Sequence, residues 1–279
     1  MDSLLVAAAL LSALLHAGWN AAAKAHADTP QAMAAQMYAA GSIGLAALPW
    51  AGLPDARALP WMAVSVGFSL GAVALLLRAY RHAGFGIAYP VTRGASVMLV
   101  VPLAAALAGE WPRPLGLAGV ALVAAAVLAL ALRGAGAVSR PGLGWALAAA
   151  ACTAAYVVSD ARGARASGSP LAYGCLLSVI NALVWGWTQR GAGGSGSPLR
   201  ALRAVGAKAW AMALAAVASY LLILWVWSHA PIALGSALRD TSALWAALIA
   251  VLWLKEPIDR ITLAALALAF AGAVLIRLG

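Results

Sequence analysis

Charged side chains are scarce in this chain of 279 residues. Asp, Glu, Lys and Arg together make up 9% of the sequence, whereas 65% of it is hydrophobic. Soluble domains carry roughly 25% charged residues, so a water-soluble globule of this size would have too few to cover its surface. The composition therefore excludes a soluble enzyme, a disordered chain and a coiled coil, and it indicates a protein whose solvent is lipid.

Cysteine and the motifs of nucleotide and metal chemistry are also rare or missing. The two cysteines, Cys152 and Cys175, each lie in an apolar run and have no Cys/His ligand spacing around them, which argues against a disulfide framework or a zinc site. There is no GxxxxGK[ST] phosphate loop and no HExxH motif. We therefore expect no ATP hydrolysis, no metal site, no cofactor and no enzyme activity.

Basic residues give a net charge of +10, but they are scattered along the chain at one to three per loop. Nucleic-acid binding needs a basic patch on a soluble face, which this distribution does not provide. Basic residues beside membrane spans among anionic headgroups explain the charge instead. The expected partners are the lipid bilayer and a small-molecule substrate, with no nucleic acid, and the chain is expected to be a monomer.

Long apolar runs fill the rest of the sequence. A membrane span takes about 20 mostly apolar residues, and the runs between Pro, Gly and charged residues predict ten helices. Their approximate limits are 3–23, 32–50, 60–80, 85–108, 113–133, 142–160, 170–189, 209–228, 232–254 and 260–278. The stretch 190–208, which is rich in Gly, Ser and Arg, predicts a flexible loop. The expected fold class is an all-α integral membrane protein with ten transmembrane helices.

The chain repeats itself. Four landmarks of the first half recur in order in the second: Trp61 with Trp210, the His-Ala pair 82–83 with 229–230, Arg93 with Arg239, and Glu110 with Glu256. The glutamate follows the arginine at the same distance in both halves. This predicts two five-helix repeats, residues 1–136 and 137–279. Because five is odd, the second repeat is expected to insert upside down, the usual plan of secondary transporters with a substrate site near the midplane between the halves.

Three short motifs resemble those of one transporter family. They are His-Ala-Gly-Trp-Asn-Ala-Ala-Ala-Lys at 16–24, Gly-Glu-Trp-Pro at 109–112 and Leu-Lys-Glu-Pro at 254–257. Together with ten spans in two halves, they resemble EamA-type carriers of the drug/metabolite transporter superfamily, with YddG-type amino-acid exporters as the most similar subtype. The resemblance implies export across the bacterial inner membrane, with cytoplasmic termini. The basic residues favour the opposite orientation, because more of them fall in loops at the other end.

Polar side chains inside the first predicted span are candidates for substrate contacts. Ser12, His16, Asn20 and Lys24 recur every four residues, with Trp19 beside them, so they share one helix face. Lipid cannot satisfy their hydrogen bonds, so this face must meet protein or water. We expect His16, Trp19 and Asn20 to line a transport cavity, and interhelical hydrogen bonding is the alternative.

The fourth and ninth spans each carry a buried arginine. Tyr89, Arg93 and Ser96 share one face of the fourth span, and Arg239 occupies the equivalent place in the ninth, next to Asp240. A charge this deep costs about 2.5–3.5 kcal/mol even on the lenient insertion scale, so it should face water, a partner or substrate. We expect all five to contact substrate. An Arg93–Asp240 ion pair could form and break during transport, or it could be a permanent clamp.

Other polar residues complete the set. Tyr156 and Asn181 are expected in the cavity, from the sixth and seventh spans. Asp160 falls at the predicted end of the sixth span, where a solvated headgroup position is expected. Glu110 and Glu256 precede prolines in loops, and a structural role is expected for them, with Arg113, Lys255 or Arg260 as partners.

The sequence leaves three functions open. The first is a secondary transporter that exports small metabolites, amino acids foremost, by alternating access between the repeats. The second is a transporter of phosphorylated or sugar-nucleotide metabolites, in which Arg93 and Arg239 would grip phosphate. The third is an intramembrane lipid phosphatase that would use the arginines with His16 and Ser96.

Overall fold

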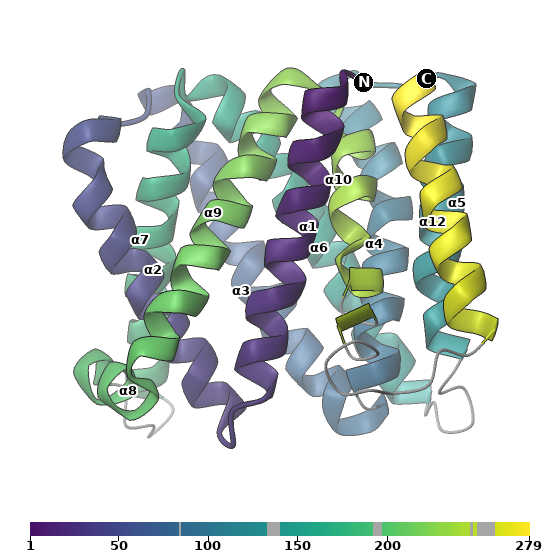
Figure 1. The fold of residues 1–279 in the computed structure, drawn as a ribbon. Coiled ribbons are helices and arrows are strands. Elements are labelled where there is room, and N and C mark those ends of the chain that lie inside the picture. The colour runs from purple at the N-terminus through teal and green to yellow at the C-terminus, as the bar shows by residue number, and fades with distance from the viewer. Residues whose placement is uncertain (84, 133–139, 192–196, 246–247, 250–259) are drawn as a thin grey trace.

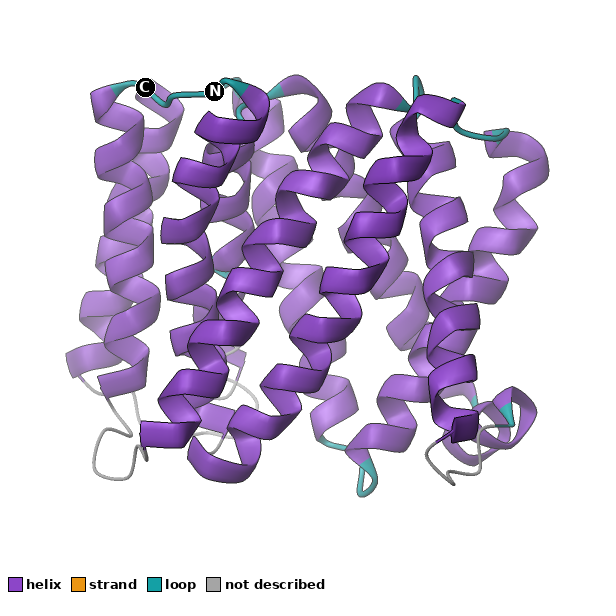
Figure 2. Ribbon diagram, turned by 180° about the vertical axis from the view of Figure 1, so that it is seen from behind, coloured by secondary structure: helices purple, strands orange, loops and turns teal. Residues whose placement is uncertain are grey.

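The computed structural model describes residues 1–83, 85–132, 140–191, 197–245, 248–249 and 260–279, and this part consists of helices joined by short connections and holds no strand (Figure 2). The elements are α1 (Ser3–Lys24), α2 (Thr29–Ala51), the short 3-10 turn η1 (Ala56–Ala58), α3 (Leu59–Ala83), α4 (Phe85–Ala108), α5 (Pro114–Leu132), α6 (Arg140–Ala166), α7 (Pro170–Gly191), α8 (Pro198–Val205), α9 (Ala207–His229), α10 (Ile232–Asp240) and α12 (Arg260–Leu278).

Helix α2 illustrates how the sequence sets the helix ends. Its first residues are Thr29 and Pro30, and the Asp28 side chain accepts a hydrogen bond from the Gln31 backbone N–H at 3.0 Å. Such an N-cap satisfies one of the free donors at a helix start. The helix ends at Gly52, whose φ of 75° favours glycine.

Within the described residues, six helices are long and apolar enough to cross a membrane. They begin at or near Ser3, Ala56, Val91, Arg140, Pro170 and Ala207, and shorter apolar stretches occur in α5 and α12. The described helices overlap all ten predicted spans. The last part of the predicted span 232–254 lies outside the described residues. These features are those of a multi-pass membrane protein.

Two sequence-based expectations are wrong. Helix α6 does not end at Asp160 but continues past Arg162 and Arg165 to Ala166. The stretch 190–208 is not a loop throughout, since α8 forms within it. Helix α8 begins with Pro198 and is followed by Gly206, whose φ is 65°. Proline is common at the first position of a helix, and glycine is common just after its last.

The chain termini lie at one end of the molecule, and helix pairs from distant parts of the chain lie side by side (Figure 1). Helix α1 packs along α9, α2 along α7, α3 along α6, and α5 along α12. Helix α4 contacts α6 and α10, and α10 also contacts α1. Each of these contacts joins a helix of the first half of the chain to a helix of the second half. The main core therefore lies between the two halves.

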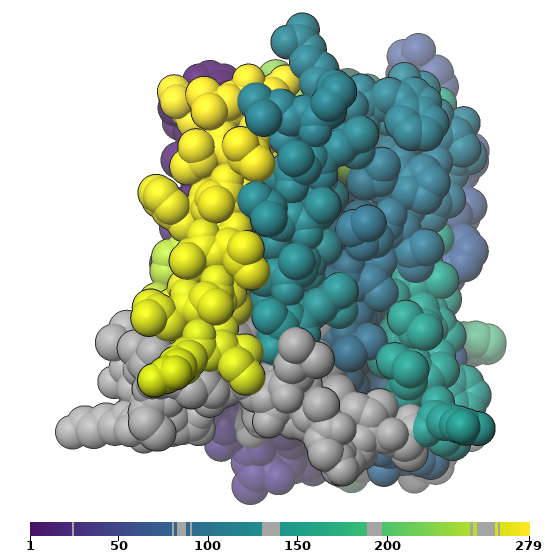
Figure 3. Space-filling view, turned by 90° about the vertical axis from the view of Figure 1, so that its right-hand side faces the viewer, coloured from purple at the N-terminus to yellow at the C-terminus, as the bar shows by residue number. Residues whose placement is uncertain are grey.

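Helices α5 and α12 form one edge of the molecule, where they run side by side (Figure 3). Glycines allow this close approach. A Cβ atom added at Gly119 would lie 2.7 Å from the Gly272 carbonyl oxygen and 2.9 Å from the Ile276 backbone nitrogen. Small residues commonly let transmembrane helices approach in this way.

We predict that Gly119→Ala destabilises the protein by about 1–3 kcal/mol, because the added methyl group meets backbone that cannot yield without separating the helices. Thermal unfolding in detergent measures the effect. Gly67→Ala is the matched control, since nothing lies within 4 Å of a Cβ atom there. Equal melting temperatures for the two variants would contradict the close packing.

Candidate functional site

Two adjacent cavities lie among the helices, and both are bordered by α1, α2, α3 and α6. The smaller, about 210 Å³, is also lined by α7, α9 and α10. The larger, about 570 Å³, also meets α4 and reaches the end of the molecule opposite the termini, where Ala23, Thr29 and Pro30 line it. His16, Trp19, Ser69 and Tyr156 line both cavities. Together, the cavities form the candidate site.

Arg93 is the centre of a buried polar cluster that joins the two halves. Its Nη1 atom lies 3.0 Å from Asp240 Oδ1, and the two residues are only 8% and 5% exposed. The Ser96 hydroxyl lies 3.2 Å from Asp240 Oδ2. The Arg93–Asp240 pair expected from the sequence is therefore confirmed, and it neutralises a charge that lipid would reject.

His16 completes this cluster. Its Nε2 atom lies 2.5 Å from Arg93 Nη2. Because a guanidinium group only donates hydrogen bonds, Nε2 must be the acceptor, and the ring is held as a neutral imidazole. The His16 ring meets Trp19 edge-on with ring centroids 5.2 Å apart, and the Arg93 guanidinium lies 5.3 Å from the Tyr89 ring. Arg93 thus has its charge and several of its donors satisfied within the protein.

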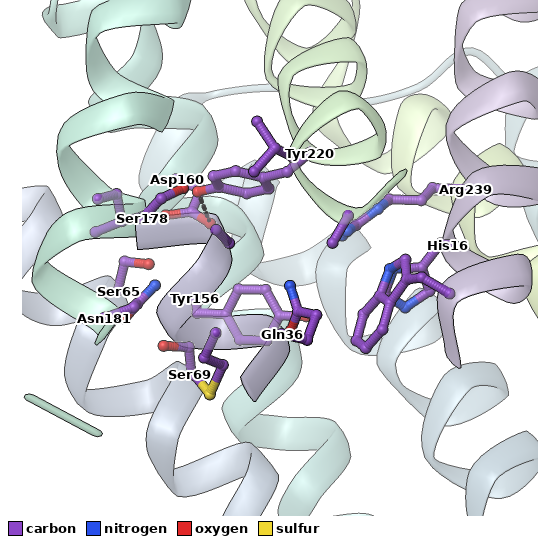
Figure 4. A pocket seen from close by; sticks show the side chains of 16 residues that line it. His16, Gln36, Ser65, Ser69, Tyr156, Asp160, Ser178, Asn181, Tyr220 and Arg239 are labelled. Atoms are coloured by element: carbon purple, nitrogen blue, oxygen red, sulfur yellow. Dashed lines mark hydrogen bonds between the residues drawn. The ribbon is translucent and has the colours of Figure 1, made fainter. Parts of the chain in front are cut away.

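Arg239 is placed differently. It lines the smaller cavity and lies 5.8 Å from the Trp227 ring, and its Nε atom has no hydrogen-bond partner among the described residues. An unpaired buried donor is costly, and it suits a site that receives an acceptor from outside the protein. Figure 4 shows Arg239 and His16 on one side of the cavity, with Asp160 and Tyr220 across from them.

Asp160 lines the smaller cavity, so the expectation that it lies at a solvated headgroup position is wrong. It is 2% exposed rather than solvated, because α6 continues for more than a turn beyond it. Its Oδ1 accepts a hydrogen bond from the Tyr173 hydroxyl at 3.1 Å, and its Oδ2 accepts one from Tyr220 at 2.7 Å. Such hydrogen bonds hold a carboxylate in place within a low-dielectric site.

The other expected site residues fall mostly on the cavity walls. Of the ten expected substrate contacts, those that line one or both cavities are His16, Trp19, Asn20, Tyr89, Arg93, Tyr156, Asn181 and Arg239. Ser96 and Asp240 lie behind Arg93 and line neither cavity. Ser12 bonds Ser219 across the α1–α9 contact, which is the interhelical alternative. Gln36, Ser65, Ser69 and Tyr220 also line the site; the sequence gave no signal for them beyond single polar residues in apolar helices.

Arg165 and Glu110 form an ion pair at the end that bears the termini. Arg165 pairs with Glu110, and it also donates hydrogen bonds to the carbonyl oxygens of Trp227 at 2.7 Å and Ala230 at 2.9 Å. Glu110 accepts one from the Ile232 backbone N–H at 2.8 Å. These hydrogen bonds pair backbone carbonyl groups at the end of α9 and a backbone N–H group at the start of α10, which have no partner within their helices. Glu110 is thus structural, as expected, but its partner is Arg165.

The remaining sequence motifs add no residue to the candidate site. Glu256 and the Leu-Lys-Glu-Pro motif lie outside the described residues. The chain also contains a match to GxSxG, Gly67-Phe68-Ser69-Leu70-Gly71, but the match lies within helix α3, whereas a nucleophile elbow needs a strand-to-helix turn. Among the described residues, no three His, Cys, Asp or Glu side chains gather as metal ligands would.

Part of the chain matches a known protein family, and the whole fold matches a solved structure. Residues 140–278 match the EamA-like transporter family. A crystal structure of another protein superposes with a TM-score of 0.74 over 99% of this chain and 96% of that chain, at 21% sequence identity, so the two share a fold. A search of curated proteins finds no match.

The protein therefore carries an EamA-like domain, which supports its place in the drug/metabolite transporter superfamily. This family match indicates a membrane transporter of small molecules.

We predict that Asp240→Ala destabilises the protein by about 3–5 kcal/mol, because Arg93 is left charged and unpaired inside the bundle. The double variant Arg93→Met with Asp240→Ala should recover much of that loss. Melting temperatures in detergent test this prediction. If the double variant were no more stable than Asp240→Ala, Arg93 would not depend on Asp240 for neutralisation.

Proposed function

We propose that the protein is a secondary transporter that exports small metabolites, amino acids foremost, across the bacterial inner membrane by alternating access between its two halves, as a monomer. One observation carries the proposal: a cavity inside the bundle exposes an arginine, Arg239, whose Nε has no partner, opposite a fixed carboxylate, Asp160. A guanidinium group binds a carboxylate in a directed, bidentate way.

The charges around the cavities balance. Arg93 is neutralised by Asp240, His16 is a neutral acceptor, and Arg239 is matched by Asp160. A site with no net charge favours a substrate with no net charge, since a surplus charge in a low-dielectric site is costly. A zwitterionic amino acid meets this condition.

Alternating access has two lines of support. Several of the largest helix contacts have a counterpart when α1 is exchanged with α6, α2 with α7, α3 with α9, α4 with α10, and α5 with α12: α1–α9 corresponds to α3–α6, and α4–α6 to α1–α10. Such an exchange is what two inverted repeats would give. In addition, the larger cavity reaches the end opposite the termini, while Arg165 and Glu110 join the halves at the end that bears them.

The two alternatives have weaker support. A phosphorylated metabolite would bring about two negative charges into a site that already holds Asp160, and Arg93 is occupied by Asp240. A phosphatase would need a free nucleophile. Ser96 is fully buried, hydrogen-bonded to Asp240 and absent from the cavity walls.

Counterflow of labelled solutes in proteoliposomes tests the proposal. The panel holds neutral, aromatic, basic and acidic amino acids and a sugar phosphate. We expect exchange of neutral amino acids, and a loss of about tenfold or more in Arg239→Met, which removes the carboxylate partner. Arg57→Met is the matched control, because that side chain lies in η1 outside the cavities and is 82% exposed.

Exchange of the sugar phosphate alone would replace the amino-acid assignment with the phosphate alternative. Unchanged exchange in Arg239→Met would contradict the role of this arginine.

A further inference from the structure

We propose that Asp160 binds the ammonium group of the substrate while Arg239 binds its carboxylate, so that the smaller cavity recognises the two charges of an α-amino acid together. This inference rests on the proposed function and deepens it: it makes the free amino group a requirement for transport. It assigns Asp160 a binding role that no sequence motif indicates.

The first argument is position. Asp160 and Arg239 come from α6 and α10 and line one cavity of about 210 Å³. They face each other across it (Figure 4). No ion pair joins them within the described part of the chain, so their opposite charges remain available to a molecule in the cavity that carries both.

The second argument is hydrogen-bonding capacity. A carboxylate has about four lone-pair sites for hydrogen bonds. Tyr173 and Tyr220 donate one bond to each oxygen of Asp160. Both oxygens therefore keep acceptor capacity, which the three N–H donors of an ammonium group can use.

The third argument is a second free acceptor on the same wall. The Oδ1 atom of Asn181 is buried and has no hydrogen-bond partner among the described residues, and Asn181 lines the same cavity. Buried polar atoms are normally hydrogen-bonded, so an exception in a cavity points to a ligand. Asn181 Oδ1 is an acceptor and Arg239 Nε is a donor, which matches the two ends of an amino acid.

The larger cavity can accommodate the side chain of a bound amino acid. It adjoins the smaller one at Trp19 and Tyr156, and apolar residues including Met33, Leu76 and Leu77 line it. Its volume of about 570 Å³ exceeds the volume of the smaller cavity, which is about 210 Å³. The arrangement fits amino acids with large apolar side chains, such as phenylalanine.

Competition in the counterflow assay tests the inference directly. Labelled L-phenylalanine is exchanged against three unlabelled competitors: L-phenylalanine, 3-phenyllactate, in which a hydroxyl replaces the ammonium group, and phenethylamine, which lacks the carboxylate. We expect wild-type protein to prefer phenylalanine over either analogue by at least about tenfold, because each analogue leaves one buried group unpaired.

The variant Asp160→Asn should change the preference rather than only the rate. Without the carboxylate, phenyllactate should compete as well as phenylalanine, while phenethylamine should lose any residual binding. A purely structural role for Asp160 would lower exchange of all substrates equally. Asp55→Asn is the matched control, because Asp55 lies in a loop and pairs with Arg57 outside the cavities.

Several outcomes would overturn the inference. Equal competition by phenylalanine and phenyllactate in the wild type would do so while leaving amino-acid transport itself intact. An unchanged preference in Asp160→Asn would also do so. If that variant fails to fold, the wild-type competition series still decides. Absence of any amino-acid exchange in the wild type would instead overturn the proposed function.

Discussion

The ion pair between Arg93 and Asp240 is the constraint around which the bundle is organised. Each residue carries a charge that lipid excludes, and each comes from a different half of the chain. Pairing them fixes α4 against α10 near the middle of the bundle and leaves His16 in contact with the same guanidinium. Arg93 is satisfied in this way, whereas the Nε atom of the second arginine, Arg239, has no hydrogen-bond partner among the described residues.

The two arginines differ in their partners and not in their burial, since Arg93 is 8% and Arg239 6% exposed. The two arginines occupy equivalent places in the proposed sequence repeat, yet Arg93 has a carboxylate partner whereas the Nε atom of Arg239 has no hydrogen-bond partner among the described residues. A similar asymmetry holds for the carboxylates, since Asp240 pairs with an arginine whereas Asp160 is held by two tyrosines. The site is therefore asymmetric, which suits a substrate with two different ends.

Much of the fold could be predicted from the sequence, because apolar runs long enough to span a bilayer dominate it. The Arg93–Asp240 pair was also predictable, since charges deep in a span must find partners. The role of Asp160 was not, because Arg162 and Arg165 follow within a helical turn or so and resemble a membrane boundary. Arg165 instead extends to Glu110 and to two carbonyl oxygens near the junction of α9 and α10, and sequence spacing carries no sign of such distant partners.

The most direct test of the account is whether the closed end opens when substrate is present. Spin labels at Arg113→Cys and Ser169→Cys, with Cys152 and Cys175 replaced by alanine, would flank the contact between Glu110 and Arg165. Pulsed electron resonance in proteoliposomes then measures the distance between the labels with and without L-phenylalanine. The account predicts a second, longer distance that gains population with substrate. A single distance, unchanged while the same sample carries out exchange, would contradict alternating access between the two halves.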